Sequence, residues 1–289
     1  MPIKASELIL NPDGSVYHLN LKPENISNTI ITVGDPDRVN QVTKHFNSIE
    51  FKTQKREFCT HTGTYKGKRI TVISTGIGTD NIDIVFNELD ALVNINLKTR
   101  EIKNDLTSLT IIRVGTSGSI QKHIPLNSFL ISEMAAGFDG LLHFYDSDVF
   151  QNKDITKALV KHTNWHKTKS DPYVVWCNLE LLEQFSSNET VNGFTVTNVG
   201  FYGPQGRILR LALQDNNLNN KLASFNFSGR SITNLEMETA GIYGMAKLLG
   251  HKALSLNAII ANRATGKFSA NPTQTIEKLI VYTLNKLVE

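Results

Sequence analysis

Two patterns of apolar positions alternate along the chain. Short runs rich in β-branched residues occur at 28–34, 69–75, 109–115, 128–134, 194–200 and 253–261. Continuous apolar runs of this length are typical of strands that are covered on both faces of a sheet. We therefore predict a buried strand at each of these segments.

The segments between these runs have helical spacing. After Asp80, apolar residues recur on one helical face at 82, 85, 86, 89, 92 and 93. A second helix is predicted from Glu238 to Gly250, because glycine often ends a helix. A last helix begins at Asn271, as its N-cap, with Pro272 in its first position. The polar stretch 95–108 predicts a surface excursion.

Alternating strands and helices predict an α/β protein with a central mixed sheet flanked by helices. The chain has 289 residues, of which 40% are hydrophobic and 20% charged, as in an ordinary globular protein. No linker rich in proline, glycine and serine divides it. We therefore predict a single domain that covers residues 1–289.

Charge and composition narrow the class of function. The net charge is +3 and no dense block of lysine or arginine occurs, so a nucleic-acid partner is not expected. No apolar run approaches the roughly 20 residues of a membrane span, and the first residues lack the pattern of a signal peptide. Cys59 and Cys177 lack metal-ligand spacing and are expected to be small buried side chains. These features together favour a cytoplasmic protein. No histidine pair has the helical spacing of a zinc site, so we expect no catalytic metal.

The first candidate anion site is "VGDPDR", residues 33–38. Gly34 ends a predicted strand, Asp35 can cap the next helix, and Pro36 suits its first position. The free N–H groups of a helix start bind anions. Arg38 lies in that first turn, where a cation opposes the helix dipole. Either Arg38 is solvated or a bound anion gives it a function; this motif alone leaves both open.

The second candidate site is "IIRVGTSGSIQ", residues 111–121, where Arg113 ends a buried run and small residues follow. The charge predicts either an internal carboxylate partner or a bound anion. Small residues allow close approach of a ligand, and ligands bind at the carboxyl ends of strands in open α/β sheets. Neither this turn nor "STGIGTDN" (74–81) has the spacing of a nucleotide-binding loop. Arg38 and Arg113 are therefore predicted to converge on a small oxyanion, for which the arginine fork is suited.

Three further polar clusters are candidates. In "NLEMETAG" (234–241), Glu236 and Glu238 cannot face the same way on one helix. They can serve different roles if Glu236 precedes the helix, or simply favour the helix start. In "FYGPQGR" (201–207), Gln205 and Arg207 can contact the edge of a flat polar ring, although a plain surface loop also explains them. His18 is isolated.

The ordered set "VGDPDRV", "KREF", "STGIG", "RVGTSGSIQ", "FYGPQGR", "NLEMETA" and "IIANR" resembles the nucleoside phosphorylases of the uridine/purine type. Each motif alone is modest, but the order is specific and covers the chain from about His18 to the final helix. The uridine-specific branch is the more similar. The resemblance implies a nucleoside phosphorylase-like fold and a pentosyltransferase in which phosphate attacks C1′, the base leaves, and pentose 1-phosphate forms.

The resemblance also implies roles at matched positions. The phosphate site would contain Gly34, Arg38, Arg56, Arg113 and Thr116. The ribose site would contain His18, Met237 and Glu238, with His18 and Arg56 supplied by a neighbouring subunit. The base site would contain Phe201, Glu236, Gln205 and Arg207. The residues expected to act in catalysis are Arg38, Arg113, Glu238, Gln205 and Arg207, which orient phosphate and stabilise developing charge.

Two departures bear on these implications. The purine branch has an aspartate in the segment that corresponds to "IIANR", whereas this chain has Asn262 and Arg263, which favours a pyrimidine. The loop "GIGTDN" differs from the family pattern, so we do not predict the monovalent cation that some relatives hold near the residue matching Glu57. The segments 95–108 and 145–190 look expanded.

The expected function is therefore phosphorolysis of a pyrimidine nucleoside, uridine above all, in nucleoside salvage, with no cofactor. The alternatives are a purine nucleoside phosphorylase, a hydrolytic nucleosidase of the same fold, and a non-catalytic nucleoside-binding protein. The expected partners are a nucleoside and phosphate, with neither nucleic acid nor membrane. Shared residues require at least a dimer, and the family suggests a hexamer. The sequence leaves the choice between ribose and deoxyribose open.

Overall fold

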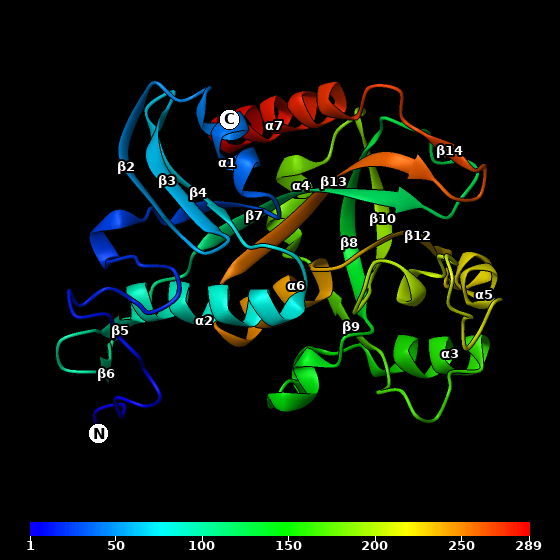
Figure 1. Ribbon diagram of the computed structural model, residues 1–289, viewed down its shortest axis with the longest axis horizontal. Helices are drawn as coiled ribbons and strands as arrows, with labels where there is room; N and C mark the ends of the chain where they lie inside the picture. The colour runs from blue at the N-terminus through cyan, green and yellow to red at the C-terminus, as the bar shows by residue number, and fades with distance from the viewer.

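A large mixed sheet forms the centre of the computed structural model, which describes residues 1–289 (Figure 1). Its strands run in the order β11-β12-β10-β8-β13-β7-β1-β4-β3-β2, while β14 pairs with β13 and β9 with β8. β12 also pairs with β7, so five strands of this order close into a ring. The strands are β1 (Thr29–Val33), β2 (Ser48–Lys55), β3 (Phe58–Tyr65), β4 (Lys68–Ser74), β5 (Ile95–Asn96), β6 (Glu101–Ile102), β7 (Thr110–Ser119), β8 (Phe129–Gly137), β9 (Tyr173–Trp176), β10 (Thr190–Thr197), β11 (Asn226–Phe227), β12 (Arg230–Glu236), β13 (Lys252–Asn262) and β14 (Lys267–Phe268).

Seven α-helices surround the sheet. They are α1 (Pro36–Thr43), α2 (Thr79–Asn94), α3 (Lys153–Thr163), α4 (Leu179–Phe185), α5 (Leu218–Ser224), α6 (Thr239–Leu248) and α7 (Pro272–Val288). Figure 1 shows α1 and α7 on one side of the central strands, and α2 and α6 on the other. The main core is a cluster of 46 buried residues, and a second cluster of 13 lies where α3 and α5 pack. No helix is both long and apolar enough to cross a membrane.

The six predicted strands and three predicted helices are present, which confirms the α/β class with a mixed central sheet. Asp35 accepts a hydrogen bond from the N–H of Asp37 as the cap of α1. Asn271 occupies the N-cap position of α7, but its side chain makes no capping hydrogen bond. Cys59 and Cys177 are free and buried as expected, and burial raises the pKa of the Cys177 thiol to about 12.

One prediction about local structure is wrong. The small residues 115–119 do not form a glycine-rich turn after the strand but continue β7 to Ser119. Gly115 pairs with Asn257 of β13, and the ladder continues to Ser119 opposite Asn262. β13 pairs with these residues in parallel, and β12 pairs antiparallel with Gly118 and Ser119, so tertiary pairing overrides the turn tendency of glycine and serine.

The sequence analysis also missed β2, β3, β9 and β12. β2 is mostly polar and exposed and forms an antiparallel hairpin with β3, so it lacks the apolar run that marks a central strand. The predicted excursion at 95–108 contains a short hairpin of β5 and β6. Segment 145–190 contains α3, β9 and α4.

Candidate active site

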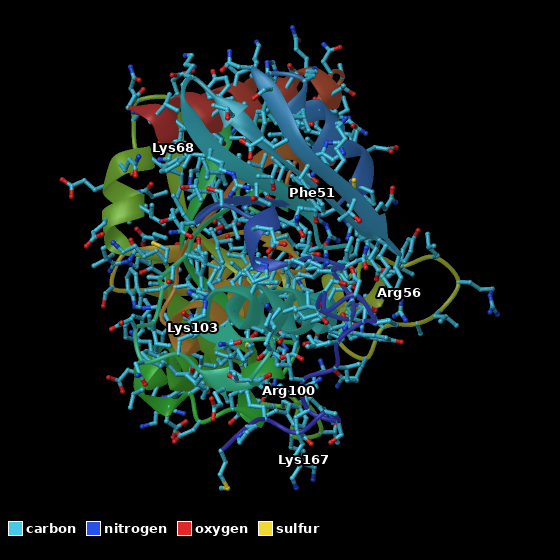
Figure 2. All side chains as sticks on the ribbon, turned by 90° about the vertical axis from the view of Figure 1, so that its left-hand side faces the viewer. Phe51, Arg56, Lys68, Arg100, Lys103 and Lys167 are labelled. Carbon is cyan, nitrogen blue, oxygen red and sulfur yellow. The ribbon has the colours of Figure 1, made fainter.

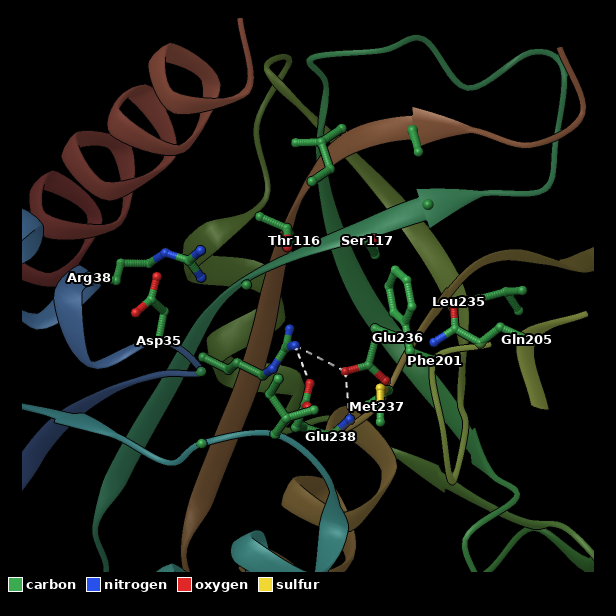
Figure 3. Close-up of a pocket in the computed structure, with 18 of the residues that line it drawn as sticks. Asp35, Arg38, Thr116, Ser117, Phe201, Gln205, Leu235, Glu236, Met237 and Glu238 are labelled. Atoms are coloured by element: carbon green, nitrogen blue, oxygen red, sulfur yellow. Dashed lines mark hydrogen bonds and ion pairs between the residues drawn. The ribbon is translucent and has the colours of Figure 1, made fainter. Parts of the chain in front are cut away.

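A cavity of about 770 Å³ opens where β1, β7 and β12 end (Figure 3). Its walls come from the segment from Gly34 to Arg38, residues 113–118 of β7, the loop 201–207, the segment 235–238 between β12 and α6, and residues 260–261 of β13, together with Glu57, Gly76, Ile77, Asn81 and Phe268. The predicted phosphate, ribose and base residues therefore lie around one space, with the exception of His18 and Arg56.

Arg113 has an internal carboxylate partner. Its Nη2 atom lies 2.6 Å from Glu238 Oε2 and 3.3 Å from Glu236 Oε2. Its Nη1 atom donates to Asn257 Oδ1 at 3.0 Å. Burial opposes the charge of this guanidinium, but Glu236 and Glu238 raise the pKa of Arg113 above its ordinary value. Of the two explanations left open by the sequence, the ion pair is present, and Arg113 also lines the cavity.

Gly115 makes room for that guanidinium. A Cβ atom at this position would collide with Nη1 and Cζ of Arg113. The arginine side chain therefore lies against the bare backbone of its own strand, two residues further along. Only glycine allows this close approach, which explains why a small residue follows a buried charge.

Arg38 differs from Arg113 because its side chain has no hydrogen-bond or ion-pair partner in the chain. The side chain projects from the first turn of α1 into the cavity (Figure 3). Its Nε atom is buried and without a partner. Burial, and after it the positive charge of Arg113, lower the pKa of Arg38. An unpaired, partly buried cation beside a second cation is unfavourable unless an anion binds between them.

Thr116 lies on the same strand as Arg113, on the wall of the cavity (Figure 3). Its hydroxyl makes no hydrogen bond within the chain, although its backbone pairs with Ala258 in the sheet. A free hydroxyl at the end of a β-strand can donate to an anion held by the neighbouring arginines.

Glu236 and Glu238 have different environments, as their spacing predicted. Glu236 ends β12, and its Oε2 atom accepts from the backbone N–H groups of Glu238 and Thr239 at 2.9 Å each. Its Oε1 atom accepts from Thr197 at 2.5 Å. Because these contacts, with that from the Thr239 hydroxyl, occupy its acceptor sites, Glu236 holds the start of α6. Its contact with a base stays a prediction.

Glu238 is the N-cap residue of α6 and faces the cavity. Its Oε1 atom accepts from the Gly78 N–H at 2.9 Å, and its Oε2 atom pairs with Arg113. Burial raises the pKa of the Glu238 carboxyl, while Arg113 opposes that shift. The carboxylate thus has fixed direction, and the half-buried Met237 lies beside it (Figure 3).

The loop 201–207 places Gln205 and Arg207 together. Arg207 Nη1 donates to Gln205 Oε1 at 2.7 Å, and its guanidinium lies 3.7 Å from the centre of the Phe201 ring. Gln205 is buried, and its Nε2 atom donates to no group of the chain. The pair therefore presents the fixed amide N–H of Gln205 beside the Phe201 ring. This arrangement suits hydrogen bonding to the edge of a flat polar ring.

His18 and Arg56 do not line the cavity of their own chain. They lie near one another instead: the Tyr17 ring contacts the His18 ring at 4.8 Å between centroids, and Arg56 Cζ lies 5.9 Å from the Tyr17 ring. Arg56 is at the turn of the β2–β3 hairpin, at the rim of the molecule (Figure 2). Both residues thus lie on one surface, although Glu57, next to Arg56 in the chain, does line the cavity.

The sequence analysis missed several residues of the site. Asn257 binds Arg113 from the middle of β13, and Arg263 donates to the carbonyl groups of Gln205 and Gly206. A lone polar residue inside an apolar run was the available signal for Asn257. The sequence analysis mentioned Arg263 only because its segment lacks the aspartate of the purine branch. No group of three or more His, Cys, Asp or Glu side chains is arranged to hold a metal ion.

Comparisons with known proteins agree with this geometry. The model of the Phosphorylase superfamily matches residues 28–285. The chain is 28% identical to a uridine phosphorylase of Thermococcus kodakarensis, over 89% of this chain and 80% of the relative. It is also 28% identical to a DeoD-type purine nucleoside phosphorylase of Shewanella frigidimarina, over 93% and 96%. Among solved structures, a Trypanosoma brucei nucleoside phosphorylase described as showing uridine phosphorylase activity superposes with a TM-score of 0.88, at 29% identity, over 97% of this chain and 99% of the other.

Proposed function

The chain belongs to the Phosphorylase superfamily, and we propose that it catalyses phosphorolysis of a pyrimidine nucleoside, uridine above all. The products are free uracil and ribose 1-phosphate. This reaction is a pentosyl transfer from the base to inorganic phosphate. The uridine phosphorylases among the relatives and the solved structures support this choice of substrate.

The unpaired Arg38 is the observation that carries the proposal. It faces the cavity beside Arg113, and burial lowers its pKa, so the protein alone does not compensate this charge. A phosphate between the two guanidinium groups compensates it and accepts hydrogen bonds from both. A protein that only binds or hydrolyses nucleosides has no need of this pair. Thr116 and the backbone at Gly34 complete this part of the site.

The ribose contacts are assigned to the wall next to Arg113. Glu238 is oriented by Arg113 and by the N–H of Gly78, and its carboxylate can accept from the ribose hydroxyl groups. Met237 packs against the sugar. A second copy of the chain supplies His18 to the 5′-hydroxyl and Arg56 to the phosphate, so the site is complete only in a homo-oligomer of at least two chains.

The base contacts are assigned to Phe201, Gln205 and Arg207. The amide of Gln205 and the guanidinium of Arg207 match the edge of uracil, and Phe201 packs near its face. The electron pair of the breaking C1′–N1 bond moves into the uracil ring and its oxygens. Hydrogen bonds from Gln205 and Arg207 stabilise that charge, so no acid at the base nitrogen is required.

In the segment where the purine branch has an aspartate, this chain has Asn262, and this difference supports a pyrimidine substrate. Asn262 is buried, and its amide donates to the carbonyl groups of Gln121 and Ile124 at 2.9 Å each. It has neither a proton to give to a purine ring nor access to the cavity. We therefore rank purine phosphorolysis below the pyrimidine reaction.

Catalysis follows from orientation and electrostatics. Arg38, Arg113 and Thr116 hold phosphate beneath C1′ as the nucleophile. As the C1′–N1 bond breaks, the sugar gains oxocarbenium character, and the phosphate charge stabilises it. A bond between a phosphate oxygen and C1′ forms while the uracil anion leaves. No cofactor takes part, and we propose that the enzyme acts in the cytoplasm, in nucleoside salvage.

The experiment is to incubate the protein with uridine, thymidine, inosine and adenosine, each with and without phosphate, and to measure free base. We expect uracil from uridine only when phosphate is present, together with ribose 1-phosphate. Release without phosphate would show a hydrolase. Release from inosine or adenosine alone would replace the pyrimidine assignment with the purine one.

A further inference from the structure

The residues Val16–Leu21, here named the histidine turn, hold His18 in a tight backbone loop. The N–H of Val16 donates to the carbonyl of Leu21 at 2.9 Å, and the N–H of Asn20 donates to the carbonyl of Val16 at 3.1 Å. Asn20 has a φ of 55°, which closes the turn. His18 therefore sits at a defined place on the backbone, but these bonds leave the direction of its ring free.

One carboxylate, that of Glu88 on α2, contacts this turn through three donors. It accepts from the N–H of His18 at 2.9 and 3.0 Å and from the N–H of Leu19 at 2.8 Å. It also lies 2.6 Å from Nδ1 of the His18 ring. Only 14% of the Glu88 side chain is exposed, compared with 27% for His18. The carboxylate thus fixes both the backbone and the ring of the same residue.

These contacts determine which ring nitrogen is available. Because the facing carboxylate only accepts, Nδ1 carries the hydrogen. Nε2 has no partner in the chain and is left to face outwards. The Tyr17 ring packs edge-on against the imidazole at an interplanar angle of 83°, which limits its rotation. The Lys55 ammonium donates to the Tyr17 carbonyl at 2.5 Å and ties the turn to the hairpin that carries Arg56.

We propose that Glu88 is a positioning residue that aims His18 Nε2 at the 5′-hydroxyl of a nucleoside bound in a second copy of the chain. This inference rests on the proposed function. In this arrangement Nε2 of the ring with its hydrogen on Nδ1 accepts from the 5′-hydroxyl, and the carboxylate behind the ring makes Nε2 a better acceptor. The same second-sphere contact fixes the tautomer of histidines that bind metals.

The test compares uridine with 5′-deoxyuridine, which lacks the group that His18 contacts. The measured quantity is kcat/KM for uridine divided by kcat/KM for 5′-deoxyuridine, in the wild-type protein and in Glu88→Gln. The amide oxygen can still accept from the backbone, but the NH₂ group then faces Nδ1. The ring therefore turns away or carries its hydrogen on Nε2, and in both cases Nε2 no longer accepts from the 5′-hydroxyl. We expect the ratio to fall about tenfold, as for loss of one oriented hydrogen bond. The value of kcat/KM for 5′-deoxyuridine should change less than twofold, because that substrate does not use His18.

Two variants make the result specific. His18→Ala should lower the ratio at least as much as Glu88→Gln. Asp83→Asn is the matched control on the same helix, since Asp83 accepts from Tyr145 at 2.5 Å and from Asn87 at 3.1 Å but does not touch the histidine turn. Asp83→Asn should leave the ratio unchanged. A fall as large as that of Glu88→Gln would show a general effect of α2 and overturn the inference.

The remaining outcomes separate this inference from the proposed function. If His18→Ala lowers the ratio and Glu88→Gln does not, the inference is wrong and the proposed function stands. If His18→Ala leaves the ratio unchanged, His18 does not contact the nucleoside. The 5′-hydroxyl contact assigned to His18 and the positioning role assigned to Glu88 are then both wrong. If Glu88→Gln does not fold, the ring nitrogen shifts of the wild-type protein at pH 8 decide, with His18→Ala for assignment. A hydrogen on Nδ1 supports the inference, and a hydrogen on Nε2 alone overturns it.

Discussion

The two ends of the cavity are built differently. At the phosphate end, Arg113 lies in the middle of β7, which pairs with β1, β12 and β13. At the base end, Gln205 lies in the irregular stretch between β10 and α5, where several large apolar side chains are exposed, among them Phe201, Tyr202, Ile208, Leu209 and Leu211. One end is set by the packed core, and the other by a loop.

This difference teaches which part of the site can change. In the proposed reaction, the phosphate end binds the reactant that is the same for every nucleoside, and any shift of its strands disturbs the main core. The base end can change its shape at lower cost, because loops tolerate substitution better than buried strands. Specificity for the base is therefore the property that this fold can alter without rebuilding the reaction.

The largest expected effect comes from Arg113→Ala. The substitution removes a phosphate ligand and leaves Glu238 as a buried carboxylate without its ion-pair partner. We expect kcat/KM for phosphate to fall about 10³-fold or more, and the free energy of unfolding to fall by about 3–5 kcal/mol. Steady-state kinetics at varied phosphate and denaturant unfolding measure the two effects. Unchanged dependence on phosphate would remove Arg113 from the phosphate site.

An intermediate effect is expected for Gly115→Ala, which adds one methyl group at the phosphate end. That methyl collides with the guanidinium of Arg113, so the arginine moves while its charge remains. We expect about a 10²-fold loss of kcat/KM, because a displacement of about 1 Å is enough for such a loss. Gly118→Ala on the same strand is the comparison, since its Cβ would meet Ala261 at an ordinary 3.6 Å. Equal losses in both variants would contradict the steric argument.

The smallest effect is expected at the base end, for Gln205→Glu. The carboxylate can keep its contact with Arg207, but its charge opposes the negative charge that develops on uracil. We expect kcat/KM for uridine to fall about tenfold, while the KM for phosphate stays within about twofold. Gln214→Glu introduces the same change at an exposed position of the same stretch and should have little effect. A large rise in the KM for phosphate would show that the two ends are not separable.

Much of the fold could be predicted because its signals are local. Apolar runs marked the central strands, and the spacing after Asp80 marked α2. The edge hairpin of β2 and β3 was missed because its exposed face is polar and its pairing comes from a partner strand. The turn expected at 115–119 was wrong for a related reason, since β13 pairs along these small residues, and β12 along the last two, and holds them extended.

The candidate site was predicted in part. The motifs identified Arg38, Arg113, Glu238 and Gln205, and the structure places them around one cavity. The sequence did not identify Asn257 or Glu88, whose contacts join segments far apart in the chain. The only local signal for Asn257 was that it is a lone polar residue in an apolar run, and no local pattern distinguishes Glu88 from the other polar residues of its helix.

The sequence by itself determined the class of fold, the ordered motifs, and the need for a partner to the charge of Arg113. Only the tertiary structure decided which residue of the chain is that partner. Glu238 arrives from 125 residues further along the chain because β12 closes against β7 and starts α6 beside it. Arg38, in the first turn of α1, is left without a partner. Local sequence cannot show that Arg113 is paired and Arg38 is not, because ion pairing and desolvation depend on which distant segments pack together.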